Sequence, residues 1–366
     1  MSHRILLTGA SGYLGGTLLA RWTSVTLPPY EKLFALVRTQ EQAVSLKQYA
    51  ATPEPLFFDI RDKEAVDSAV VGNKITIVYF LVDAVNVEAQ KHFIAALAEV
   101  KKSTGLDVHF LHTSGAKIFS SHAGAPIDRP LLDNEEGLYE IQKAQIPPLL
   151  APVQQASPPP LIPSSSRAIP LAIDTNNTVI EEATAHGVRS YVFVPCVVYG
   201  KGEGFGNPIS IQTVAIIRAA KATRQVLSVD PGRPIWPVCH VLDNTTLYLE
   251  LLRKILAGDN PGHGRQGYYL AAAGSVAWVD LYSVIARSLK KRGVIDQDSI
   301  TQASDQELEK MATALGCPKE FVALQLGGIC TLSAVHGSEI GWKPTFAASH
   351  ILETADEEVD WVLANL

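Results

Sequence analysis

Cysteine is scarce in this chain of 366 residues, and long apolar runs are absent. No apolar stretch reaches the roughly 18 residues that span a bilayer, so no membrane segment is expected. The histidines show no H-E-x-x-H or comparable spacing, so no metal site is predicted. The cysteines form no C-x-x-C pair, which predicts reduced thiols and excludes a disulfide framework or a zinc cluster. There are four of them: Cys196, Cys239, Cys317 and Cys330.

Charge is also limited. Charged residues make up 19% of the chain, hydrophobic residues make up 47%, and the net charge is −6. Because no basic stripe is available to neutralise phosphates, a nucleic-acid partner is not expected. The first residues lead directly into an apolar strand without a signal-peptide pattern, so a cytoplasmic location is expected.

The stretch MSHRILLTGASGYLGG places a glycine-rich turn directly after an apolar strand, Ile5 to Leu7. An amphipathic segment from Thr17 to Trp22 follows. Glycines at this spacing allow a tight turn and bring backbone N–H groups against a pyrophosphate at the start of a helix. We therefore predict a dinucleotide site, with an ordinary glycine-rich turn as the alternative. The predicted contacts are Gly9, Ser11, Gly12, Tyr13, Leu14 and Gly15.

Arg38 stands at the end of a second apolar strand, residues 32–37, and no acidic residue accompanies it there. In a dinucleotide-binding fold an acidic residue at this position binds the ribose hydroxyls of NAD, whereas an arginine accommodates the 2′-phosphate of NADP. The sequence therefore favours NADP over NAD. The alternative is a solvated arginine that only marks the end of the strand.

Further apolar strands are expected at residues 55–60, 74–82, 106–111 and 189–198, with helices between them. This alternation predicts an α/β protein with a doubly wound parallel sheet, in which ligands bind at the carboxyl ends of the strands. Asp59 could accept a hydrogen bond from the adenine amine while Ile60 packs on the ring. In the alternative, Asp59 caps the helix expected at residues 61–71. Val82 and Ser114 fall at the same edge of the sheet.

The chain resembles an extended short-chain dehydrogenase/reductase, of the NAD(P)-dependent epimerase/dehydratase family. The resemblance is carried by the segments TGASGYLG, FFDI, HTSG, FVPCVVYGKG, CHVLD and IGWKP. It implies a Rossmann domain with a smaller C-terminal α+β substrate lobe, and it places Pro195 beside the cofactor. Val194 departs from the family, in which an arginine precedes this proline. The expected domains are 1–200 plus about 240–272 for the cofactor, and about 201–239 plus 273–366 for the substrate.

The resemblance also implies a catalytic tyrosine and lysine, spaced Tyr-x-x-x-Lys, and a serine. Here they correspond to Tyr139, Lys143 and Ser114, with Thr113 as a rival to the serine. A phenol with a pKa near 10 needs a neighbouring ammonium and the cofactor charge before it can act near neutral pH. Ser114 would hold the substrate oxygen.

A proline-rich stretch follows Lys143 and is expected to form an inserted loop over residues 144–173. It contains eight prolines, through which no helix is expected, so the next helix would begin with Asp174 or Thr175 as its N-cap. Two interpretations remain open: either Tyr139 and Lys143 are catalytic with a loop inserted behind them, or the pattern arose by chance and the usual pair is lost. The loop itself is either a lid or a disordered insertion.

The expected function is an NADP-dependent oxidoreductase that transfers hydride between nicotinamide and a carbonyl or secondary alcohol. Phe205, Trp236 and Trp278 would line an apolar pocket for a small-molecule substrate, although Trp236 could equally belong to the core. One alternative is a cofactor-retaining epimerase or isomerase without net redox change. Another is a non-catalytic NADP(H)-binding regulatory protein. His240 is expected to be structural, and a homodimer is possible.

Overall fold

The computed structural model describes residues 2–148 and 168–366. Its centre is a seven-stranded sheet with the order β11-β7-β5-β4-β1-β2-β3, in which every pairing is parallel. The strands are β1 (Arg4–Leu7), β2 (Lys32–Leu36), β3 (Glu54–Leu56), β4 (Ile77–Phe80), β5 (His109–Thr113), β7 (Arg189–Pro195) and β11 (Tyr268–Ala271). The predicted doubly wound parallel sheet is confirmed.

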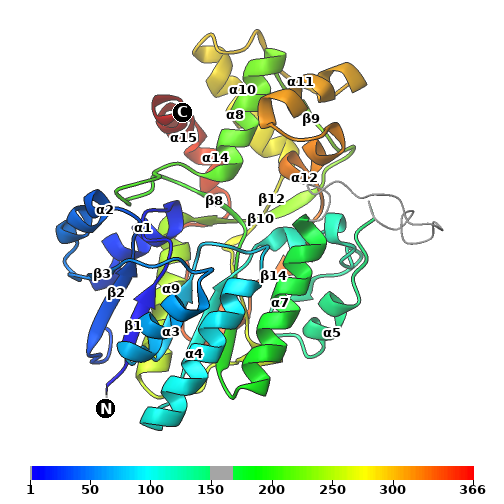
Figure 1. Cartoon of the computed structure of the whole chain (residues 1–366). Helices are drawn as coiled ribbons and strands as arrows, with labels where there is room; N and C mark the ends of the chain where they lie inside the picture. The colour runs from blue at the N-terminus through cyan, green and yellow to red at the C-terminus, as the bar shows by residue number, and fades with distance from the viewer. Residues whose placement is uncertain (1, 149–167) are drawn as a thin grey trace.

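Helices cover both faces of this sheet (Figure 1). One face packs against α3 (Lys63–Gly72), α4 (Glu88–Thr104) and α7 (Ala168–Ala185). The other packs against α1 (Tyr13–Ala20) and α9 (Val241–Leu256). The strands at its centre are buried on both faces, which explains their nearly continuous apolar sequences. Among the described residues, no helix is long and apolar enough to cross a bilayer.

The remaining elements form a C-terminal lobe above the carboxyl edge of the sheet (Figure 1). Its members are α8 (Ile211–Thr223), β9 (Gln225–Ser228), α10 (Trp278–Lys291), β13 (Gln297–Gln302), α11 (Asp305–Leu315), α12 (Val322–Leu326), α14 (His350–Glu353) and α15 (Ala355–Asn365). A small sheet of β8 (Val197–Tyr199), β10 (Ile235–His240) and β12 (Gly274–Ala277) lies between this lobe and the main sheet. All seven strands of the main sheet fall within residues 1–200 and 240–272.

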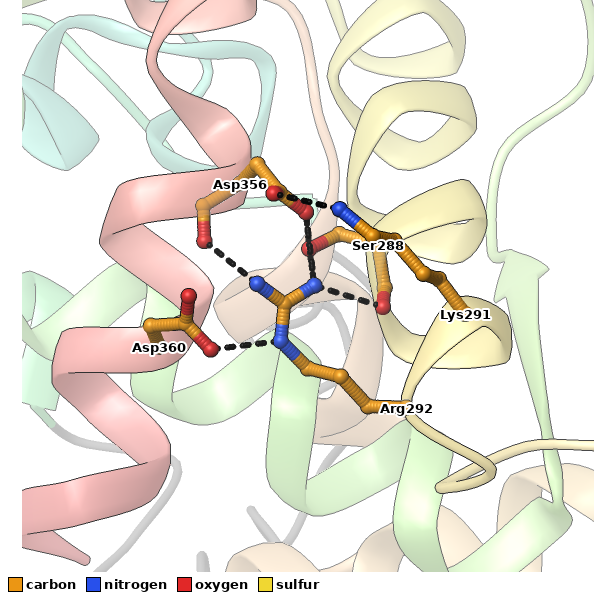
Figure 2. A network of polar contacts seen from close by, with 5 residues as sticks. All are labelled: Ser288, Lys291, Arg292, Asp356 and Asp360. Atoms are coloured by element: carbon orange, nitrogen blue, oxygen red, sulfur yellow. Dashed lines mark hydrogen bonds and ion pairs between the residues drawn. The ribbon is translucent and has the colours of Figure 1, made fainter.

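Within the lobe, Arg292 connects the C-terminal helix α15 to the end of α10 (Figure 2). Its Nε donates to Asp360 at 2.5 Å and its Nη1 donates to Asp356 at 2.6 Å, so one guanidinium at the end of α10 binds two carboxylates of α15. Nη1 also donates to the Ser288 hydroxyl at 2.6 Å. These contacts hold the pKa of the Asp356 carboxyl well below its usual range.

The structure corrects the expected start of α3 and the expected end of β3. Asp62, rather than Asp59, is the N-cap of α3 and accepts the N–H groups of Glu64 and Ala65. β3 ends at Leu56, earlier than expected, and Asp59 lies in the turn that follows, where it accepts the N–H of Arg61 at 2.9 Å.

A helix begins before the end of the proline-rich stretch that was expected to form a loop over residues 144–173. α7 begins at Ala168, so the expectation of a loop up to residue 173 is wrong at that end. Pro170 is the third residue of the helix, where a backbone N–H has no intrahelical acceptor and proline is tolerated. Residues 149–167, which hold most of the expected lid or disordered insertion, lie outside the described residues.

Candidate cofactor and substrate site

The turn after β1 has the geometry that a pyrophosphate requires. Gly9 has a φ of +71°, and a Cβ added at Gly15 would lie 2.3 Å from the Gly9 carbonyl oxygen, so larger residues are excluded there. Gly12 is the N-cap of α1 and offers no side chain to its first turn. The first N–H groups of α1 therefore have no side-chain cap and are available to an anion. These residues fit the phosphates of a dinucleotide.

A second glycine-rich segment, residues 200–208, packs against this turn. The Asn207 N–H donates to the Ser11 carbonyl at 3.0 Å, and the Tyr13 hydroxyl donates to the Gly200 carbonyl at 2.6 Å. A Cβ added at Gly16 would lie 2.6 Å from the Cα of Gly204. Sequence reasoning missed this backbone-to-backbone contact, although glycine at every second position from 200 to 206 is the signal that could have found it.

We expect Gly16→Ala to destabilise the protein although it adds a better helix former. The new methyl group would meet the Gly204 backbone, and overpacking of this kind costs about 1–3 kcal/mol. Gly72→Ala is the matched control, because Gly72 also lies in a helix and no atom lies within 4 Å of its added Cβ. Urea unfolding measures both. Equal free energies of unfolding for the two variants would contradict the close contact.

Arg38 lies after β2, where the sequence predicts the adenosine end of the site. It is exposed, and its backbone N–H donates to the Gln42 side chain at 2.8 Å. Among the described residues no carboxylate pairs with its guanidinium, which leaves the guanidinium available to a phosphate. Ile60 and the exposed Val82 follow β3 and β4 at the same edge, and Pro195 is the last residue of β7.

Ser114 also lies at this carboxyl edge, directly after β5. It is buried, its N–H donates to the Phe193 carbonyl at 2.8 Å, and its hydroxyl has no hydrogen-bond partner among the described residues. The rival Thr113 is different, because its hydroxyl lies 2.8 Å from the Tyr248 hydroxyl and is already engaged. The geometry favours Ser114 as the group that binds a substrate oxygen.

Tyr139 and Lys143 do not lie with Ser114 at the carboxyl edge of the sheet. Both belong to the short helix α5 (Leu138–Lys143), and both bind Glu181: the Tyr139 hydroxyl at 2.5 Å and the Lys143 amine at 2.5 Å. Glu181 is in the second half of α7, which leads to the amino end of β7. The Arg265 guanidinium, 4.6 Å from the Tyr139 ring centroid, directly precedes the amino end of β11. The pair thus lies toward the amino edge of the sheet, whereas the glycine turn lies at its carboxyl edge. Figure 1 shows α5 on the other side of the molecule from α1.

Contrary to the prediction from the sequence, the structure does not bring Tyr139 and Lys143 together with Ser114 and the glycine turn. Burial and the Glu181 carboxylate raise the pKa of Tyr139, the opposite of the lowering that an acid–base role needs. α5 is also tied to α7 by Gln142, which accepts from Asn176 at 3.0 Å and donates to Asn177 at 2.7 Å. Of the two interpretations left open by the sequence, the geometry favours the chance match.

The aromatic residues expected in the substrate pocket are packed instead. Trp236 and Trp278 are buried with their ring centroids 5.6 Å apart, and the Trp278 indole donates to the Gly328 carbonyl at 3.0 Å. Phe205 packs on Tyr49 with ring centroids 6.2 Å apart.

His240 is the N-cap of α9, where its Nδ1 accepts the Leu242 N–H at 3.2 Å. The expectation that Asp243 or Asn244 caps this helix is therefore wrong. The contact supports a structural role for His240.

Comparison with known proteins connects this chain to one family. Residues 5–157 match the model of the NAD dependent epimerase/dehydratase family. The predicted family resemblance is confirmed. Members of this epimerase/dehydratase family are nicotinamide-dependent enzymes, in keeping with the enzyme class expected from the sequence. No curated protein matches the chain.

Solved structures similar to this chain share the extended epimerase/dehydratase fold. A UDP-glucose 4-epimerase from Thermotoga maritima is 14% identical with a TM-score of 0.60, over 99% of each chain. A dTDP-glucose 4,6-dehydratase from Streptomyces venezuelae, solved with NAD, is 14% identical with a TM-score of 0.62, over 99% of this chain and 97% of that one. The PbgP3 protein of Burkholderia pseudomallei is 12% identical with a TM-score of 0.63, over 100% and 99%.

We expect Tyr139→Phe to lower stability and to leave any NADPH-dependent turnover unchanged. The variant removes the hydroxyl that binds Glu181, a hydrogen bond to a charged group worth about 1.5–3 kcal/mol, and touches nothing at the carboxyl edge. Ser114→Ala is the contrasting variant, since its hydroxyl has no partner to lose; it should keep its stability and lose turnover. Thermal unfolding and NADPH consumption measured side by side test both. A Tyr139→Phe protein that is stable but inactive would restore the catalytic interpretation.

Proposed function

We propose that this protein is an NADP-dependent oxidoreductase that transfers hydride between nicotinamide and a carbonyl or secondary alcohol of a small substrate. The observation that carries the proposal is the Ser114 hydroxyl, buried and without a partner in the described chain, at the same sheet edge as the uncapped start of α1. The bound cofactor would supply the hydride. Ser114 would donate a hydrogen bond to the substrate oxygen and fix its orientation.

Apolar side chains near this edge support a substrate of low polarity. Val82 after β4 and Leu171 in the first turn of α7 are each 43% exposed, and Ile211 at the start of α8 is 81% exposed. An apolar substrate would cover exposed apolar side chains of this kind. The proposal of an apolar substrate therefore rests on these exposed side chains, and no longer on Trp236 and Trp278, which are buried. The domain division, a cytoplasmic location and a homodimer stay predictions.

The position of Tyr139 favours a second candidate, an NADP(H)-binding protein without turnover. α7 contains no lysine, so this helix offers no ammonium that could replace Lys143. Incubation with NADPH and a panel of aldehydes and ketones, followed by absorbance of the reduced cofactor, separates the candidates. Consumption of NADPH supports the oxidoreductase, whereas tight NADPH binding without consumption of the cofactor favours the second candidate. An isomerase would convert a hydroxylated substrate without consuming cofactor.

We expect Arg38→Asp to reverse the cofactor preference. The guanidinium makes charge-assisted hydrogen bonds to a 2′-phosphate, and an aspartate repels the phosphate while accepting the ribose hydroxyls of NAD. Affinity for NADPH should fall by about 10- to 100-fold, which corresponds to about 1.4–2.8 kcal/mol. Fluorescence titration with NADPH and NADH measures the change. Arg218→Asp, at an exposed position on α8, is the control for a general charge effect. Unchanged affinities for both cofactors would rule out the NADP assignment.

A further inference from the structure

A cavity of about 490 Å³ lies between the C-terminal helices and the start of the glycine-rich segment 200–208. Gly200, Lys201 and His240 line it on one side. The other side is one face of α14 and the following α15, and its residues recur at helical spacing: His350, Thr354, Glu357, Glu358 and Trp361. The volume is in the range of small-molecule sites. The glycine turn and Ser114 are not part of this lining.

Contacts within the chain fix the walls of this cavity. The Gly200 N–H donates to the buried Glu358 carboxylate at 2.9 Å, and the Gly200 carbonyl accepts from the Tyr13 hydroxyl at 2.6 Å. Glu358 also accepts from the Ser210 hydroxyl at 3.0 Å. Gly200 has a φ of +97°, and a Cβ added there would lie 2.4 Å from Nε2 of His240. Only glycine therefore leaves the His240 ring in its place beside the cavity.

The Trp361 ring at one end of the cavity already holds a cation. The Lys201 ammonium lies 4.1 Å from the centroid of this ring. The indole N–H donates to the Pro208 carbonyl at 2.9 Å, which fixes the orientation of the ring. Lys201 is exposed, and its ammonium has no ion pair and no hydrogen bond within the described parts of the chain. The ring is thus the contact that holds the ammonium at this position.

The charges around the cavity favour a cation as well. Two carboxylates, Glu357 and Glu358, face a single ammonium, that of Lys201. Glu357 is exposed, lies four residues before Trp361 on the same helix face, and has no ion pair among the described residues. Burial lowers the pKa of the His240 imidazole to about 4, so this ring adds no positive charge at neutral pH. An anion in the cavity would meet both carboxylates, whereas a cation is attracted by them and by the indole ring.

We propose that this cavity is a second ligand site, which binds a small organic cation whose charged group takes the place of the Lys201 ammonium on the Trp361 ring. Glu357 supplies the opposite charge. Lys201 can leave the ring because its side chain is exposed and flexible, and because the attraction of an exposed ammonium to a ring is weak. The site is separate from the cofactor turn, and the proposal does not depend on the oxidoreductase activity.

Two matched probes test this assignment: choline and 3,3-dimethylbutan-1-ol, which have the same shape and differ in charge. Each is titrated into the full-length protein while the indole N–H signals of its five tryptophans are followed by NMR. The signal that is missing in Trp361→Phe identifies Trp361. We expect choline to shift this signal in a saturable manner and to bind about fivefold more tightly than the uncharged alcohol.

Charge variants assign the binding to the cavity. Lys201→Gln should strengthen choline binding by about two- to fivefold, because the competing ammonium is gone, and Glu357→Gln should weaken it by a similar factor. Lys343→Gln, at another exposed lysine without an ion pair in the described chain, is the control for a general charge effect and should leave the affinity unchanged. Equal binding of the two probes, no saturable shift, or weaker choline binding by Lys201→Gln would overturn the assignment. The comparison of the probes on the wild-type protein decides even if a variant fails to fold.

Discussion

The close approach of backbone to backbone around the start of α1 is the constraint on which the candidate site depends. Gly15 lies against the Gly9 carbonyl, and Gly16 lies against Gly204, so α1 is held between the turn that precedes it and a segment some 190 residues away in sequence. Only residues without a Cβ permit both contacts. The same absence of side chains leaves the first N–H groups of the helix uncovered, so the close packing and the candidate cofactor site have one cause.

Two buried carboxylates connect the main sheet to the segments that return from the C-terminal lobe. Asp133 accepts the N–H groups of Leu270, Val335 and His336. Asp243 accepts those of Thr345 and Phe346, while the Trp342 indole donates to the Asp243 carbonyl at 3.1 Å. The segments CHVLD and IGWKP, which carried part of the family resemblance, are therefore the two halves of one structural contact. Their presence supports the fold and says little about the substrate.

The fold could be predicted from the sequence because buried parallel strands impose a local pattern. Nearly continuous apolar runs at 32–37 and 74–82, separated by helical segments, leave few arrangements besides the doubly wound sheet. The edge on which Tyr139 lies could not be predicted in the same way. A Tyr-x-x-x-Lys spacing shows that two side chains share one helix face, but the position of α5 is fixed by contacts of Gln142 and Glu181 with residues 34 to 42 positions away. The start of α7 at Ala168 could not be predicted from the prolines either. Proline is excluded from a helix interior but tolerated in the first turn, so its presence does not show where a helix begins.

Ser114 marks the limit of sequence reasoning at the site itself. A serine after a strand end is ordinary in sequence, and what distinguishes this one is a buried hydroxyl with no hydrogen-bond partner among the described residues. That property belongs to the packed surroundings, where burial removes the water that would otherwise bind the hydroxyl. The free energy cost of leaving such a group unpaired is recovered when a ligand supplies the missing hydrogen bond. The residue on which the proposed substrate contact depends was therefore recognised by the contact that it lacks.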